Sequence, residues 1–215
     1  MSLRVLNFKT GKADFIGFQR KFFNWFWQKL NEAEQAIFVI SFLKWKPMGK
    51  RIDQLIASLS EVFEGEPWYG ESVMRKLENV SYIIGDKTCL PESHNVAQIV
   101  AHLISWKNFA IEKLRSNGSF NIKIDSKQDW PEVEVQSRKD WEDLKHELVV
   151  AQNDIYDFLK DKSDHFLDEK VAGRDYTYDF LLKGIIQHDI YHLGQIGLIQ
   201  SQLKNQEKHS GVFKS

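Results

Sequence analysis

The spacing of apolar residues constrains this chain most, because it repeats with a helical period over four long segments. The first segment begins at residue 51, and the other three cover residues 96–115, 137–162 and 178–203. Runs of alternating β-branched residues are nearly absent, and only residues 120–124 resemble a strand. Four long amphipathic helices with short connections predict an all-α protein, a four-helix bundle.

Polar residues mark where these helices should start. Asn95 is followed three residues later by Gln98, and Ser137 by Asp140, a spacing typical of capped helix starts. Thr177 precedes the last segment and should cap it. A shorter helix is expected over residues 69–80, after the break at Gly65-Glu66-Pro67.

Composition excludes several classes of protein. The formal net charge is −1, whereas nucleic-acid binders usually carry a strong basic excess, so no nucleic-acid partner is expected. No run of about 18 apolar residues exists, which predicts no transmembrane segment. Cys89 is the sole cysteine and no secretory signal is recognisable, so a cytoplasmic location is expected.

Residues 1–47 differ in composition from residues 48–215. They hold eight basic and three acidic residues, and eleven of the 28 aromatic residues. This shift predicts a helical N-terminal extension at residues 1–47, followed by the bundle at residues 48–215. Three interpretations of the extension are open. It is a basic amphipathic helix that docks on a membrane or a partner, or an extra helix or hairpin packed on the main domain, or an extension under little selection upstream of an ancestral domain that begins at Met48. Its aromatic side chains should pack on the bundle or on a second copy, which favours a homodimer.

Three histidines occupy positions where apolar residues are expected. His188 and His192 are four residues apart and share one face of the last helix, while His102 lies on the apolar stripe of the second. A histidine pair at this spacing can clamp zinc or nickel, and a third imidazole would leave one coordination position open. The alternative is that all three are ordinary core histidines with hydrogen-bond partners.

The sequence from His188 to His192 also approaches the zinc-protease pattern His-Glu-x-x-His. Asp189 replaces the glutamate and is one methylene shorter, so its reach to a metal-bound water is doubtful. Few residues follow His192, and Glu207 is the one candidate for a downstream ligand. The protease interpretation is therefore disfavoured.

Neighbouring residues are candidates for pocket walls or for hydrogen-bond acceptors behind the imidazoles. Aromatic residues on apolar stripes are equally expected as plain core, and Asp189, rotated about 100° from His188, as solvated. The six candidates are Trp68, Tyr69, Trp106, Gln187, Asp189 and Gln195.

Residues 50–205 resemble the DinB-like, YfiT-like superfamily of metal-binding four-helix bundles. The resemblance rests mainly on residues 94–106 (HNVAQIVAHLISW) and 188–196 (HDIYHLGQI). The segments 67–70 (PWYG), 129–131 (DWP) and 176–178 (YTY) add to it.

This resemblance implies a metal triad at His102, His188 and His192. Characterised members of the superfamily use nickel or zinc to activate a small thiol or a water, and include thiol S-transferases, a thiol-dependent isomerase and hydrolases. The expectation is a metal-dependent enzyme that acts on a small molecule, with one divalent ion and a low-molecular-weight thiol as cofactors. The alternative is a non-catalytic metal-binding or interaction protein on the same bundle.

Overall fold

The structure is a computed structural model that describes residue 31 and residues 50–90 and 93–211, with backbone only at 50 and 207–211. The chain divides into two units after Met48, and every helix below belongs to the second. The predicted extension, residues 1–47, lies outside the described residues apart from Asn31, so it stays a prediction.

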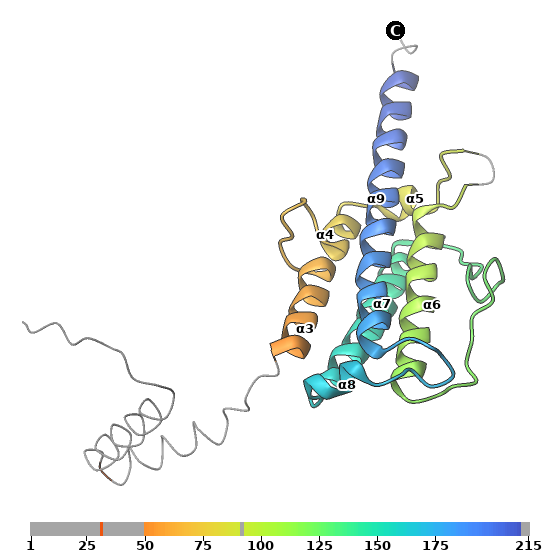
Figure 1. Ribbon diagram of the computed structural model, residues 1–215. Coiled ribbons are helices and arrows are strands. Elements are labelled where there is room, and N and C mark those ends of the chain that lie inside the picture. The colour runs from red at the N-terminus through yellow and green to blue at the C-terminus, as the bar shows by residue number, and fades with distance from the viewer. Residues whose placement is uncertain (1–30, 32–49, 91–92, 212–215) are drawn as a thin grey trace, which may run out of the picture. The chain divides into compact units, whose positions relative to one another are not determined.

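Four long helices form the bundle that the apolar periodicity predicts. Figure 1 shows α3, α9 and α6 side by side, with α7 behind them. Their bounds are α3 (Lys50–Phe63), α6 (Val96–Leu114), α7 (Arg138–Leu159) and α9 (Tyr178–Gly211). The described part of the chain has no strand, and residues 120–124 are irregular apart from a turn. The all-α prediction is therefore confirmed.

Three short helices join the long ones: α4 (Val73–Glu78), α5 (Tyr82–Gly85) and α8 (Asp164–Asp168). The helix predicted over residues 69–80 is shorter than expected, because Gly70 has a φ of 131° and the helix begins only after Ser72. Helices α5 and α8 were not predicted, since four or five residues are too few to establish a periodic pattern.

The predicted caps fix where the two central helices begin. The backbone N–H of Gln98 donates to Asn95 Oδ1 over 2.8 Å, and the backbone N–H of Asn95 donates to Gln98 Oε1 over 2.9 Å. Ser137 and Asp140 make the same reciprocal pair at the start of α7. The cap on α6 sets its start, so that His102 lies two turns into the helix.

Polar side chains are buried midway along the bundle, between two apolar clusters. On α6, the buried apolar residues between positions 96 and 103 belong to one cluster, and those between positions 109 and 114 belong to the other. On α9, Leu181–Ile185 and Leu193–Ile196 divide in the same way. The buried polar residues of this middle layer are His102, Lys107, Gln152, Asp189 and His192.

The last helix runs past its predicted end near Leu203 to Gly211. Residues 204–210 contain neither proline nor glycine, so nothing in this stretch stops the helix. No described helix combines the length and the apolar character that crossing a membrane requires.

Candidate metal centre

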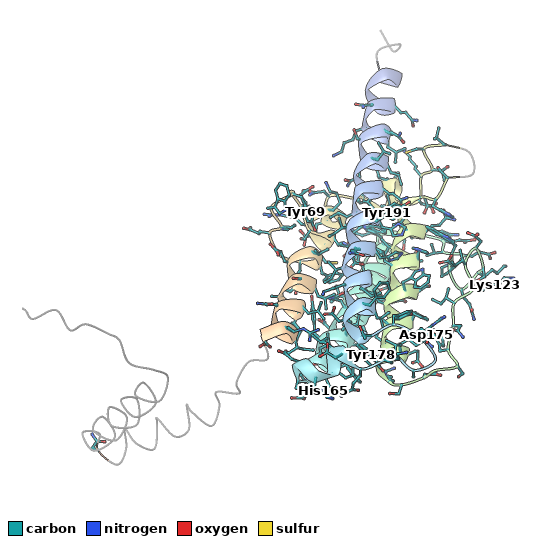
Figure 2. The ribbon with its side chains drawn as sticks, in the orientation of Figure 1. Tyr69, Lys123, His165, Asp175, Tyr178 and Tyr191 are labelled. Atoms are coloured by element: carbon teal, nitrogen blue, oxygen red, sulfur yellow. The ribbon has the colours of Figure 1, made fainter. Side chains whose placement is uncertain are left out.

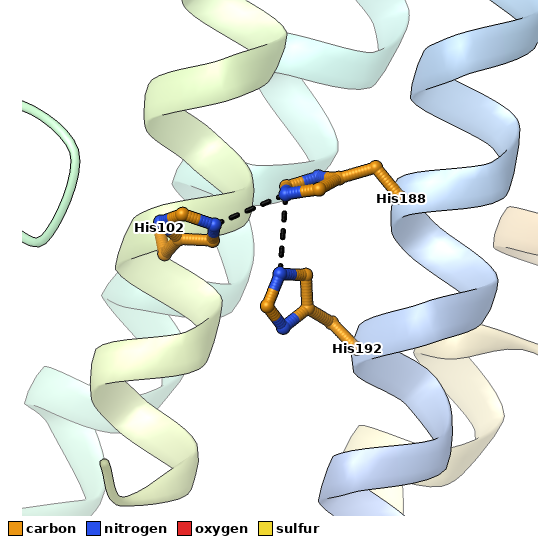
Figure 3. Close-up of side chains that lie close together, drawn as sticks. All are labelled: His102, His188 and His192. Atoms are coloured by element: carbon orange, nitrogen blue, oxygen red, sulfur yellow. Dashed lines mark hydrogen bonds between the residues drawn. The ribbon is translucent and has the colours of Figure 1, made fainter. Parts of the chain in front are cut away.

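Three imidazoles from two neighbouring helices converge on one point. His102 comes from α6, while His188 and His192 lie one turn apart on α9 (Figure 3). The Nε2 atom of His188 is 3.0 Å from Nε2 of His102 and 3.1 Å from Nε2 of His192. One ring nitrogen from each histidine lies within 4.8 Å of the others, so the group could hold a metal ion.

The connection between α6 and α7 fixes the tautomer of His102. Its Nδ1 lies 2.7 Å from the backbone carbonyl oxygen of Asp129. Because a carbonyl oxygen can only accept, Nδ1 carries the hydrogen and the neutral ring presents its Nε2 lone pair to the cluster. The Asp129 carboxylate is itself held by Trp106 Nε1 at 2.9 Å and by the Asp125 amide at 2.9 Å.

A side chain on α9 fixes His192 in the same way. Its Nδ1 lies 2.6 Å from Gln195 Oε1, and Gln195 Nε2 donates to the Tyr191 hydroxyl over 3.0 Å. The amide group of Gln195 is thereby oriented with its oxygen toward the imidazole. His192 consequently donates through Nδ1, and its Nε2 lone pair also faces the cluster.

The three facing nitrogens offer more acceptors than hydrogens. His188 can carry at most one hydrogen on Nε2, so it cannot donate to both His102 and His192. A cation would satisfy all three lone pairs at once. Zn–N bonds are about 2.0–2.1 Å long, so nitrogens 3.0 Å apart can share one ion. Three protein ligands would leave a further coordination position open.

Burial keeps these imidazoles neutral, which is the form that binds a metal. Desolvation is the main cause that lowers the pKa of His188 to about 3, and repulsion from His192, His102 and Lys107 contributes less. Desolvation and repulsion from His102 lower the pKa of His192 to about 4. Desolvation also lowers the pKa of His102.

An aromatic stack covers one side of the cluster. The indole of Trp130 lies parallel to the His102 ring at a centroid distance of 3.8 Å, and to His94 at 3.6 Å. Trp106 meets His188 edge-on at 5.8 Å. These rings limit the rotation of the imidazoles and shield them from solvent.

A cavity of about 520 Å³ opens onto the three histidines. Its volume falls within the ~300–1,000 Å³ that is usual for small-molecule sites. Trp106 and Gln195, both predicted to lie near the three histidines, are among its lining residues.

The structure places the other four predicted neighbours elsewhere. Trp68 is 94% exposed, and neither Trp68 nor Tyr69 lines the cavity. Figure 2 shows Tyr69 beside the α3–α4 connection, whereas Tyr191, which does line the cavity, lies on α9. Gln187 is exposed and borders a separate hollow with Arg51. The solvated interpretation of Asp189 is wrong, because its side chain is buried and paired with Lys107 at 2.6 Å.

Sequence reasoning did not assign roles to Asp129, Trp130 and Tyr191. Asp129 and Trp130 stand in one of the motifs that carry the family resemblance, so a signal for them existed. Asp129 contacts His102 Nδ1 through its backbone carbonyl at 2.7 Å and through carboxylate Oδ1 at 3.2 Å, and the shorter of these contacts is one that residue type alone does not predict.

Comparison with known proteins agrees with this arrangement. Residues 40–196 match the family model of the DinB superfamily, which is well over half of the chain. No curated protein and no solved structure showed significant similarity to the chain. A match of this extent, over an all-α bundle with a three-histidine group, identifies the chain as a member of the DinB superfamily.

Proposed function

We propose that this protein is a metal-dependent enzyme. Its residues His102, His188 and His192 would hold one divalent ion, nickel or zinc, and activate a thiol or a water against a small molecule. The observation that carries the proposal is the convergence of three neutral Nε2 atoms at the wall of a cavity. Two of the rings have their other nitrogen engaged by a fixed acceptor.

The residues around the site divide the work of such a reaction. A divalent cation held there would supply Lewis acidity, which lowers the pKa of a thiol or water that reaches it. The Asp129 carbonyl and Gln195 hold the ligand imidazoles in one tautomer and orientation. Trp106 and Trp130 exclude water from one side, and the cavity positions the small molecule.

For thiol transfer, the balance of bonds is simple. The thiol sulfur forms a bond to an electrophilic carbon of the small molecule, and the bond from that carbon to its leaving group breaks. The leaving group keeps the electron pair, and the thiol proton passes to solvent. Hydrolysis follows the same pattern with water in place of the thiol.

The first test is metal stoichiometry. Untagged wild-type protein should bind one equivalent of nickel or zinc, and His192→Ala should lose stoichiometric binding, as measured by elemental analysis and calorimetric titration. Exposed His146 provides the matched control, and His146→Ala should keep one equivalent. One full equivalent in His192→Ala would overturn the assignment of the ligands.

Metal loading should also stabilise the wild type. A ligand that binds only the native state adds about 2.7 kcal/mol at a concentration one hundred times its Kd. His192→Ala should show no such gain in thermal unfolding. A thiol-conjugation screen on nickel- and zinc-loaded protein then tests catalysis. Stoichiometric metal without turnover of any thiol or hydrolysable substrate would favour the non-catalytic alternative.

A further inference from the structure

We propose that the cavity beside the three histidines receives an uncharged, apolar molecule with an aromatic ring, and that Gly184 provides the space for it. The proposal rests on the proposed function only in treating this molecule as the substrate of that site. It adds the chemical class of the substrate and a residue that determines specificity.

The walls of the cavity carry almost no free charge. Among the described residues that line it, there is no lysine, arginine or glutamate. Asp129 is the one carboxylate, and its two oxygens already accept from Trp106 Nε1 and the Asp125 amide. The remaining walls are mainly apolar and aromatic, with Phe109 and Ile185 among them.

An ionised substituent on the ligand would find no partner against these walls. Moving a carboxylate or sulfonate from water into apolar surroundings costs far more than aromatic contacts return, unless a cation neutralises it. The metal position is the one place where the cavity could offer a cation. The part of the ligand beyond that position should therefore be neutral and apolar.

Apolar side chains also surround the cavity where it meets solvent. Ile124, Phe180 and Tyr191 line the cavity although they are 69%, 64% and 63% exposed. Contact between large apolar side chains and water is unfavourable, and a ligand that covers them lowers the free energy of the system. They belong to both the α6–α7 connection and α9, so the opening is apolar on two sides.

Gly184 lies one turn before His188 on α9 and lines the same cavity. A Cβ atom built at this position meets no heavy atom within 4 Å, so the absent side chain leaves open space. Glycine inside a helix is less stable than alanine, because it loses more conformational freedom on folding. Close packing does not explain the glycine here, because no neighbouring atom would contact a Cβ atom. We infer instead that the glycine leaves space in the cavity beside the three histidines.

Two fluorescent probes that differ mainly by one charge test the class of ligand. N-phenyl-1-naphthylamine is neutral, and 8-anilino-1-naphthalenesulfonate is a closely related anion. Titrated against metal-free full-length protein, the neutral probe should bind at one saturable site at least tenfold more tightly than the anion. Equal or tighter binding of the anion would overturn the proposal.

The role of Gly184 is tested by filling its space. Gly184→Leu should weaken binding of the neutral probe at least tenfold, because the new side chain occupies the cavity. Gly197 on the same helix also has open space at its Cβ but does not line the cavity, so Gly197→Leu should stay within twofold of wild type. Unchanged binding in Gly184→Leu, or an equal loss in both variants, would overturn the assignment.

Metal content separates this proposal from the proposed function. Gly184→Leu should fold with wild-type helicity by circular dichroism and keep one equivalent of metal, because leucine favours a helix more than glycine does. If wild type binds no metal, the proposed function fails while the probe experiments still decide the class of ligand. If metal binds but the neutral probe does not, the cavity proposal alone is wrong.

Discussion

Two polar clusters lie in the middle layer of the bundle, and both are built from α6 and α9. The histidine cluster is His102, His188 and His192, and the lysine cluster is Lys107, Asp189 and Gln152, the last from α7. His188 and Asp189 are consecutive residues, so their side chains point in directions about 100° apart and enter different clusters.

The clusters differ in where their positive charge comes from. Lys107 Nζ donates to Asp189 Oδ2 over 2.6 Å and to Gln152 Oε1 over 2.7 Å, so the lysine cluster contains its own cation. The histidine cluster offers facing lone pairs and opens onto a cavity. Buried acceptors without a cation of their own indicate a binding site, whereas a self-neutralised pair indicates a structural contact.

The largest predicted effect is on the lysine cluster. Lys107→Met should reduce the free energy of unfolding by about 3–5 kcal/mol, because it leaves a buried carboxylate without its partner. Desolvation already raises the pKa of Asp189, and Lys107 opposes that rise. Urea denaturation of the metal-free protein measures the loss.

A double substitution separates the pair from the packing around it. Lys107→Met combined with Asp189→Leu should recover most of the stability, since apolar residues of similar volume often replace a buried ion pair without cost. Metal stoichiometry should remain at one equivalent in the double variant. Loss of metal together with the ion pair would break the distinction between a structural and a binding cluster.

The second prediction concerns the support of the histidine cluster. Gln195→Leu should weaken metal binding about 10–100-fold, because His192 loses the acceptor that orients it and fixes its tautomer. Gln187 is exposed on the same helix, so Gln187→Leu serves as the control and should keep wild-type affinity. Calorimetric titration with zinc decides between them, and equal affinities in the two variants would contradict the role of Gln195.

The sequence predicted the parts of this comparison that depend on periodicity. Apolar stripes predicted α6 and α9, and the spacing of His188 and His192 predicted a shared face. Their meeting with His102 required α6 and α9 to be neighbours, which the family resemblance implied and the structure confirms.

What could not be predicted depends on contacts between distant segments. Lys107 and Asp189 are 82 residues apart, and Asp189 was interpreted as solvated because its side chain points about 100° away from that of His188. The Asp129 carbonyl reaches His102 through an irregular connection. A backbone atom in such a loop leaves no mark in residue type.

The smallest predicted effect concerns the proton, the simplest cation that could enter the histidine cluster. His192 has a pKa of about 4 in the folded protein against 6.5 for an unperturbed histidine. Above pH 6.5 neither state takes up the proton. Between pH 6.5 and 4 the unfolded chain binds it and the folded protein does not, so the free energy of unfolding falls as the pH falls.

For His192 alone this loss should reach about 1 kcal/mol between pH 6.5 and 5.5 in metal-free protein. Urea denaturation at the two pH values should therefore show a smaller decline for His192→Gln than for wild type. Substitution of exposed His146 by glutamine should leave the decline unchanged. Equal declines in wild type and His192→Gln would mean that His192 takes up a proton as readily in the folded protein as in the unfolded chain. The contrast with the lysine cluster would then fail, because a proton would satisfy the facing lone pairs without a metal ion.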